Sequence, residues 1–271
     1  MTVRFVRLIA EGREDLWTSQ QDFSRLFGLS GSVPRQGAPY GPLEHLRYIK
    51  RRRGEKIVAI DSATEALLGW IGMFPDKEEG EPFYRLAGIE VHADHRGTGI
   101  GRSLMEEAGK YLRAHRASRL RFGTSPLLTQ NAGLFARRFG THYRWKGGVR
   151  SPEGRPWPYV TCECDYDDPL PRPLGLRDEE ALERSVLDWE GMRPVPRSPV
   201  VYAGALFVVL PVLTGTLLAQ TAERVPMFLE TLSEVFQGLH LHGYTFAWFD
   251  RVPANTPSPL SYYAMARLLG I

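Results

Sequence analysis

The chain has 271 residues, 43% of them hydrophobic and 24% charged, a balance that supports one large packed domain or two small ones. The formal net charge of +3 is too small to favour nucleic acid as a partner, although it suits an anionic ligand. The two cysteines, Cys162 and Cys164, share one face of a predicted strand. We therefore expect two small core residues in a reducing, cytoplasmic compartment, and neither a disulfide nor a metal pair.

Two segments bear on targeting and membranes. Residues 3–9 alternate like a strand and are interrupted by arginines, so we expect no signal peptide. Residues 199–222 carry no charge and are long enough to span a bilayer. Pro211 and Gly215 divide this stretch into two runs of strand length, so we expect two buried strands and no membrane partner.

Hydrophobic periodicity and turn residues locate the elements of the N-terminal part. In chain order we expect a strand at 2–9, helices at 14–27 and 43–53, strands at 56–61, 66–74 and 83–91, a helix at 100–115, a strand at 119–123, a helix at 125–139, and strands at 143–149 and 157–165. Residues 76–82 are expected to form a loop. The basic end of the second helix precedes Gly54, which is typical of a helix end and not of a nucleic-acid patch.

The C-terminal part follows a proline-rich linker at 169–174. In this part we expect a helix at 178–189, the two apolar strands, a helix at 225–240, a strand at 244–249 and a final helix at 259–269. His240 and His242 lack further ligand spacing, so we interpret them as a basic helix end and predict no metal site.

A glycine-rich turn joins the strand at 83–91 directly to the helix at 100–115. It consists of Arg96, Gly97, Thr98, Gly99, Ile100 and Gly101. The first N–H groups of a helix lack intrahelical partners and glycines let a ligand approach them, so the turn predicts a phosphate or pyrophosphate site. Arg96 and Arg102 add positive charge beside it. A Walker loop needs Gly-Lys-Ser/Thr and a dinucleotide fingerprint needs Gly-x-Gly-x-x-Gly after the first strand; neither pattern is present.

The turn matches the acyl-CoA motif Arg/Gln-x-x-Gly-x-Gly/Ala of the GNAT superfamily of N-acetyltransferases, and the element order over 2–166 resembles that family. The resemblance implies an α/β fold with a mixed, mostly antiparallel split sheet flanked by helices. In such a sheet the strands before and after the central helix diverge. The domain is expected at 1–168, and residues 175–271 resemble a truncated, degenerate second GNAT half without a glycine cradle.

The resemblance also implies a cofactor and its contacts, namely acetyl-CoA or another acyl-CoA. Backbone amides near Ile89 and Val91 would bind pantetheine, and residues 96–102 would bind the pyrophosphate. From the helix at 125–139, we assign Asn131, Phe135 and Arg138 to the cofactor site. The acceptor would be an amine of a small molecule or of a protein, and whether the chain is a homodimer stays open.

Catalysis by direct attack of an amine on the thioester needs a base and a proton donor for the thiolate. Glu90 and His92 share one strand face, and Glu90 is our preferred base, with His92 as the alternative. The family's usual tyrosine acid, four residues before the helix-ending glycine, is replaced here by Ala136 beside Phe135. Tyr143 is the nearest phenol in sequence. The alternative function is a non-catalytic acyl-CoA-binding or protein-interaction module.

Overall fold

The computed structural model of this protein describes residues 2–18, 42–78, 80–124, 139, 142–145, 160–167, 187–190, 193–196, 206–211, 225–251 and 260–267. Its contacts divide the chain into two compact units. The first contains Met1–Gly31 and Arg35–Phe122, and the second contains Ser32–Pro34 and Gly123–Ile271.

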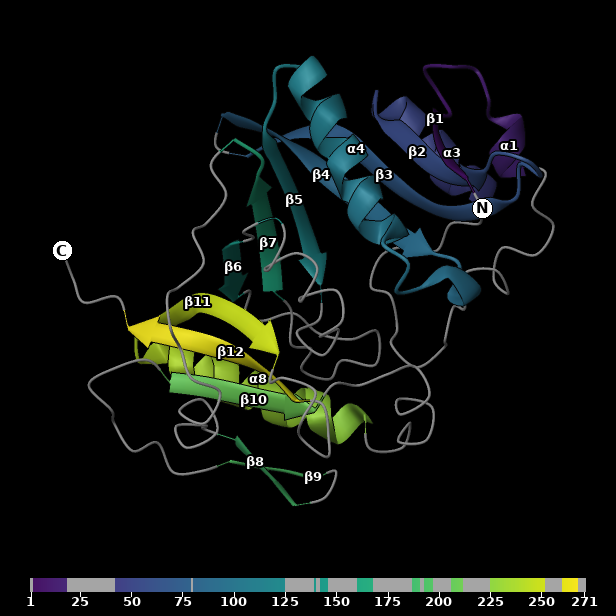
Figure 1. The fold of residues 1–271 in the computed structure, drawn as a ribbon. Coiled ribbons are helices and arrows are strands. Elements are labelled where there is room, and N and C mark those ends of the chain that lie inside the picture. The colour runs from purple at the N-terminus through teal and green to yellow at the C-terminus, as the bar shows by residue number, and fades with distance from the viewer. Residues whose placement is uncertain are drawn as a thin grey trace. The chain divides into compact units, whose positions relative to one another are not determined.

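The first unit is built on a mixed sheet with helices on both faces (Figure 1). Four strands form an antiparallel run, and a fifth pairs with the fourth in parallel: β1 (Val3–Arg7), β2 (Glu55–Asp61), β3 (Leu67–Glu78), β4 (Glu81–Val91) and β5 (Arg119–Thr124). The helices are α1 (Asp15–Thr18), α3 (Pro42–Arg51), the short 3-10 helix η1 (Ala93–His95) and α4 (Ile100–Ala114). This confirms the predicted split-sheet α/β fold of the N-terminal part.

The two faces of the sheet bury different helices. Trp17 of α1 and His45 of α3 both contact the ring of Trp70 on β3, with ring centroids 5.4 and 5.2 Å away. On the other face, α4 packs so closely over Gly69 that a Cβ there would lie 3.2 Å from Ile100 and from Leu104. Because β2 lies between two helical layers, its side chains from 55 to 60 are all buried.

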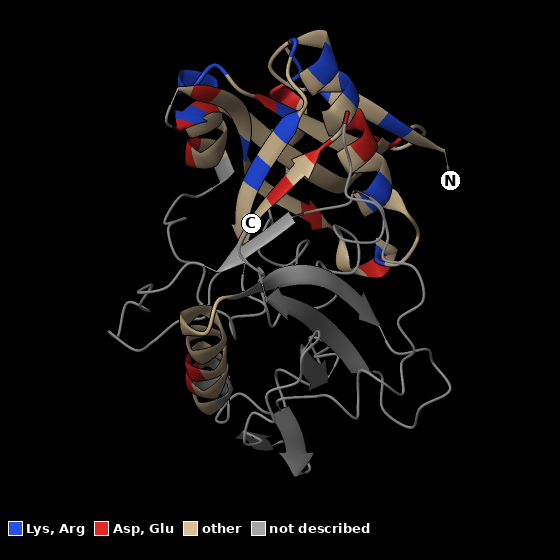
Figure 2. Ribbon diagram, turned by 90° about the vertical axis from the view of Figure 1, so that its left-hand side faces the viewer, with Lys and Arg blue, Asp and Glu red and all other residues tan. Residues whose placement is uncertain are grey.

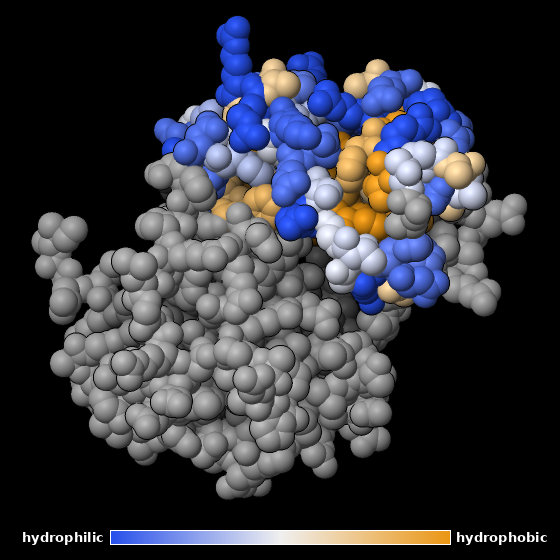
Figure 3. All heavy atoms as spheres, viewed as in Figure 1, coloured by the Kyte–Doolittle hydropathy of each residue, from blue (hydrophilic) through white to orange (hydrophobic). Residues whose placement is uncertain are grey.

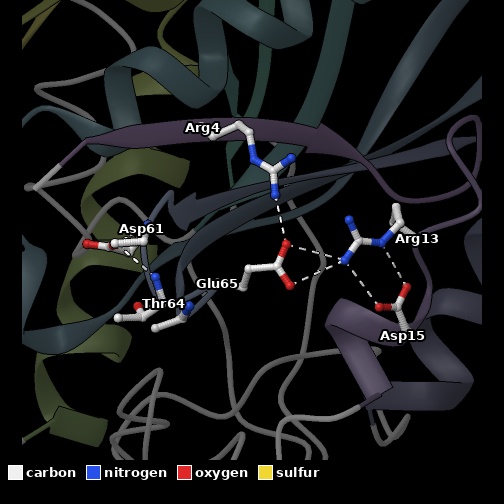
Figure 4. A network of polar contacts seen from close by, with 8 residues as sticks. Arg4, Arg13, Asp15, Asp61, Thr64 and Glu65 are labelled. Carbon is white, nitrogen blue, oxygen red and sulfur yellow. Dashed lines mark hydrogen bonds and ion pairs between the residues drawn. The ribbon is translucent and has the colours of Figure 1, made fainter.

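A buried carboxylate fixes the turn after β1. Glu55 is only 2% exposed, and its two oxygens accept hydrogen bonds from the backbone N–H groups of Ile9 and Ala10, at 2.9 and 3.0 Å. Such bidentate acceptance stabilises a buried charge that would otherwise be costly. Nearby, Glu65 pairs with Arg4 and Arg13 on the surface (Figure 4), where each exposed ion pair contributes about 0–1 kcal/mol.

Ion pairs also connect the strands at the β3–β4 hairpin. Arg85 of β4 pairs with Asp76 of β3 at 2.7 Å. From β5, Arg121 pairs with Glu78 at 3.1 Å and Arg119 pairs with Glu81 at 3.4 Å. Basic and acidic residues are interspersed over this unit (Figure 2), and Figure 3 shows apolar residues between largely hydrophilic ones on the described surface.

The described residues of the second unit form three strand groups and one long helix. The strands are β6 (His142–Trp145) paired with β7 (Val160–Asp165), β8 (Leu187–Glu190) paired with β9 (Arg193–Pro196), and a sheet in which β12 (Leu260–Arg267) lies between β10 (Leu206–Pro211) and β11 (Tyr244–Arg251). Helix α8 (Val225–Leu241) buries Leu232, Phe236 and Leu239 at helical spacing. Cys162 and Cys164 are buried in β7 without a disulfide, and burial raises the pKa of the Cys162 thiol.

Three predictions about elements are wrong. The expected final helix at 259–269 is the strand β12, because it completes a sheet with a partner on each side. The expected loop at 76–82 is the end of a hairpin, since β3 extends to Glu78 and β4 begins at Glu81. The end of the helix expected at 178–189 forms β8, whose partner β9 was not predicted.

Other predictions are confirmed or lie outside the described residues. The helices at 43–53, 100–115 and 225–240 are present as α3, α4 and α8, and the first apolar run after residue 199 contains β10. The linker at 169–174 and nearly all of the helix at 125–139 lie outside the described residues. None of the described helices has the length and apolar character needed to cross a bilayer.

Candidate functional site

The site begins where β5 separates from β4. Among the described residues these strands pair only at Tyr84 with Leu120 and Arg85 with Arg121, so β4 continues to Val91 without a β5 partner. The backbone N–H of His92 donates to Leu68 of β3 at 2.8 Å. Because the backbone direction alternates along a strand, the N–H and C=O groups of Ile89 and Val91 point to the opposite edge, away from β3.

The glycine-rich turn follows directly, and its conformation depends on glycine. Gly97 and Gly99 have φ values of 81° and 93°, in the left-handed region that side chains disfavour. A Cβ at Gly97 would meet no atom within 4 Å, and one at Gly99 would meet only Arg102 Nη2 at 3.9 Å. Protein atoms therefore leave the space beside these two glycines open, and a bound phosphate group needs such space.

Helix α4 starts at this turn without a side-chain cap. Its N-cap is Gly99, no side-chain oxygen bonds to the first turn, and no acidic residue lies there. The first intrahelical bond runs from Ser103 N–H to Gly99 C=O at 3.0 Å, which leaves the preceding N–H groups without intrahelical partners. An anion at this end would gain hydrogen bonds and a favourable helix dipole.

Two arginines and His92 lie around the turn. Arg96 Nε donates to the Val91 carbonyl oxygen at 3.3 Å, which agrees with the outward direction of that backbone group. The Arg102 guanidinium lies beside Gly99 and pairs with Glu106 at 3.6 Å. The imidazole of His92 caps η1, because its Nδ1 accepts from the backbone N–H of Asp94 at 3.2 Å. Its Nδ1 is therefore already engaged as an acceptor.

Glu90 lies on the α1–α3 face of the sheet. It pairs in register with Trp70, and the Trp70 ring contacts α1 and α3. The Glu90 side chain is half-buried and its Oε1 atom is shielded from solvent. A carboxylate on this face lies next to the open edge of β4 without blocking it, which is a suitable arrangement for a base that acts on a group held at that edge.

Sequence reasoning missed a cluster next to Glu90. Lys56 is fully buried, and its Nζ lies 2.9 Å from His45 Nδ1, 3.2 Å from the ring centroid of Trp17 and 4.2 Å from that of Trp70. Burial lowers the pKa of Lys56 well below its ordinary 10.5, whereas the two indole faces favour the charged form. Each such contact is worth about 2 kcal/mol or more when desolvated, and the desolvation of an ammonium costs several kcal/mol. The lowered pKa of Lys56 indicates that burial prevails.

The predicted site residues fall into three groups. The predicted residues of the strand and the turn lie together at one end of β4. They are Ile89, Glu90, Val91, His92, Arg96, Gly97, Thr98, Gly99, Ile100, Gly101 and Arg102. Tyr143 lies in β6 of the second unit. Asn131, Phe135 and Arg138 lie outside the described residues. The described residues contain no cluster of metal-ligating side chains.

These features fit one kind of ligand. The uncapped start of α4 provides N–H donors and nearby arginines for a pyrophosphate. The outward backbone groups of Ile89 and Val91 provide donors and acceptors for a chain that carries amides, as pantetheine does. Because both sets lie on consecutive segments, one extended molecule with a pyrophosphate and an amide-bearing arm fits them together.

One family model and several solved structures are similar to parts of this chain. Residues 18–141 match the model of the Acetyltransferase (GNAT) family, and no curated protein sequence matches the chain. Similar solved structures include a putative acetyltransferase from Acinetobacter baylyi, with 16% identity, 65% of this chain and 98% of that chain covered, and a TM-score of 0.47. The ribosomal-protein-S18-alanine N-acetyltransferase from Escherichia coli gives 13% identity, coverage of 65% and 99%, and a TM-score of 0.43. A NatC complex bound to Gag peptide and CoA gives 12% identity, coverage of 61% and 99%, and a TM-score of 0.43.

Proposed function

We propose that this protein transfers an acetyl group from acetyl-CoA to an amine, because residues 18–141 match the model of the Acetyltransferase (GNAT) family, which uses acetyl-CoA. The acceptor is an amine of a small molecule or of a protein, and the catalytic domain spans residues 1–168. The observation that carries the proposal is the unpaired edge of β4 that leads directly into the uncapped helix α4.

Each segment of the site has a separate role in binding. Bound acetyl-CoA supplies a thioester, whose carbonyl carbon is the electrophile. The N–H groups at the start of α4, with Arg96 and Arg102, bind the pyrophosphate. The outward N–H groups of Ile89 and Val91 bind the pantetheine arm and stabilise negative charge that develops on the carbonyl oxygen during attack.

The proton balance assigns a role to Glu90. As the acceptor nitrogen forms its bond to carbon, its proton passes to the Glu90 carboxylate, directly or through water, and the carbon–sulfur bond breaks. The sulfur leaves as a thiolate and takes a proton from a phenol or from water. Tyr143 is our candidate phenol, since the position that usually holds the family's tyrosine is Ala136. His92 is less suited as a base because its Nδ1 already caps η1.

The test removes the open space above the turn. In Gly99→Val plus Gly101→Val, new side chains occupy the place of the pyrophosphate, so we expect the calorimetric affinity for acetyl-CoA to fall by about 100-fold or more, the equivalent of losing several charge-assisted hydrogen bonds. The matched control is Gly80→Val, because Gly80 has a similar φ of 89°, lies in the β3–β4 turn, and has no neighbour within 4 Å of its Cβ position.

The outcomes separate binding from catalysis. Unchanged affinity in the double variant would refute the assignment of the turn, whereas an equal loss in Gly80→Val would mean that backbone strain alone is responsible. Release of free thiol from acetyl-CoA, followed with a panel of amines, then tests the transfer itself. If acetyl-CoA binds and no amine in a panel of small molecules and peptide N-termini accelerates thiol release, the protein is a binding module.

A further inference from the structure

The Arg96 side chain reaches back from the glycine-rich turn to the open edge of β4. Its Nε donates to the carbonyl oxygen of Val91, the last residue of β4, at 3.3 Å. This carbonyl is one of the outward backbone groups that the proposed site offers to a pantetheine arm. Arg96 is exposed, and so is this hydrogen bond, so the contact lies at the surface where a ligand can reach it.

The backbone that carries Arg96 is held by local hydrogen bonds, although η1 buries no residue. The Arg96 N–H donates to the Ala93 carbonyl oxygen at 3.3 Å. The Thr98 hydroxyl donates to the His95 carbonyl oxygen at 2.6 Å, and the imidazole of His92 caps the start of η1. Because these bonds hold the main chain on both sides of Arg96, its exposed guanidinium can change partners by side-chain rotation alone.

Two partners compete for this guanidinium when an acyl donor binds. The Val91 carbonyl is uncharged, and its distance from Arg96 Nε exceeds the common N–H···O distance of about 2.9 Å. A pyrophosphate is negatively charged and accepts two parallel bonds from one guanidinium, which makes it the stronger partner. Arg96 precedes Gly99, the N-cap of α4, in the same turn, so its side chain stands between the two parts of the proposed site.

We propose that Arg96 is a specificity-determining residue that restricts the donor to acyl thioesters carrying a pyrophosphate. This inference rests on the proposed acetyl transfer and on its assignment of β4 and the turn. A donor without a pyrophosphate leaves the guanidinium on the Val91 carbonyl, where it covers the edge that the pantetheine arm needs. A pyrophosphate draws the guanidinium away and uncovers this edge. The nucleotide end of the donor therefore increases the affinity for the arm in addition to making its own bonds.

The two halves of the donor test this coupling without a known acceptor. S-acetylpantetheine carries the thioester and the arm, and ADP carries the pyrophosphate. With the wild type, saturating ADP should raise the calorimetric affinity for S-acetylpantetheine by about 5-fold or more, within the usual range for coupling between two sites. Arg96→Met keeps an unbranched side chain without charge or donors. It should bind S-acetylpantetheine alone more tightly by the same factor, because the edge is always uncovered, and ADP should add nothing.

The matched control is Arg102→Met, since Arg102 also lies beside the turn and pairs with Glu106 of α4 at 3.6 Å. It should weaken ADP binding, but the affinity for S-acetylpantetheine, with and without saturating ADP, should match the wild type.

Three results overturn the inference. The first is a wild-type affinity for S-acetylpantetheine that saturating ADP leaves unchanged, and this result needs no variant to fold. The second is an Arg96→Met variant that binds S-acetylpantetheine no more tightly than the wild type does. The third is an equal gain in Arg102→Met, which would assign the effect to charge at the turn and not to the contact with Val91. If acetyl-CoA itself does not bind to the wild type, the proposed function fails, which is a different result.

Discussion

The buried amine of Lys56 should make the free energy of unfolding depend on pH, and this dependence can be tested. This amine is fully buried and has one hydrogen-bond partner among the described side chains, His45 Nδ1 at 2.9 Å. Burial lowers the pKa of the folded-state amine from its ordinary 10.5. Between the folded and the unfolded pKa, the unfolded chain binds one proton more than the folded chain. The free energy of unfolding therefore rises with pH in this window, by up to about 1.4 kcal/mol per pH unit.

Replacing Lys56 with methionine removes this dependence. The thioether chain has a similar volume and needs no proton, so the packing against Trp17 and Trp70 is kept. We expect the variant to be more stable than the wild type at pH 7, by about 1–3 kcal/mol, as when other buried charges are replaced by apolar residues. Above pH 10.5 the advantage disappears, because the lysine is then neutral in both states.

The assay is urea unfolding followed by circular dichroism at several pH values from 6 to about 10.5, the ordinary pKa of lysine. Lys77→Met is the matched control, since Lys77 is exposed on β3 and its removal should change neither the stability nor the pH slope. If Lys56→Met lowers the stability at pH 7 and leaves the slope unchanged, Lys56 is a cation held by the two indole faces. That result would refute our conclusion that burial prevails over the cation–π contacts.

Two further predictions concern the backbone and the base. Gly54→Ala should destabilise the protein by about 1–3 kcal/mol, because its Cβ would lie 2.2 Å from the Met73 carbonyl oxygen. Gly238→Ala should stabilise it by about 0.5–1 kcal/mol in the same unfolding assay, because a Cβ at this position in α8 meets nothing within 4 Å and alanine favours a helix. Glu90→Gln should lower the transfer rate by about 10²–10⁴-fold at neutral pH and leave the affinity for acetyl-CoA nearly unchanged. A rate within about twofold of the wild type would exclude Glu90 as the base.

The turn was predictable because its chemistry is local. Gly97 and Gly99 adopt positive φ values that other residues disfavour, and the strand and helix on either side have clear periodicity. The placement of Glu90 on the same face as Trp70 follows from the strand register. Where the backbone conformation depends on neighbours in sequence, the pattern was sufficient to identify the element.

The remaining features depend on distant partners. Lys56 follows Glu55 at the start of a strand, where two charged residues suggest exposure. The packing of α1 and α3 buries Lys56, and the turn after β1 covers the Glu55 carboxylate. The segment 260–267 suits a helix or a strand, and the flanking strands β10 and β11 decide in favour of a strand. The charged residues of the β3–β4 hairpin suggest a loop, but their partners are arginines on β4 and β5.

A single bulge in β4 connects these distant effects to the site. Arg85 pairs with Phe74 and Glu90 pairs with Trp70, so both lie on the α1–α3 face although an odd number of positions separates them. Strict alternation would place them on opposite faces. The register shift between the pairs Gly72–Gly88 and Met73–Leu86 leaves one extra residue in β4, and this bulge restores the carboxylate to that face. It also follows directly after the last β4–β5 pair, where the added twist favours separation of the two strands. The same local irregularity therefore accounts for the open edge of β4 and for the direction of the proposed base.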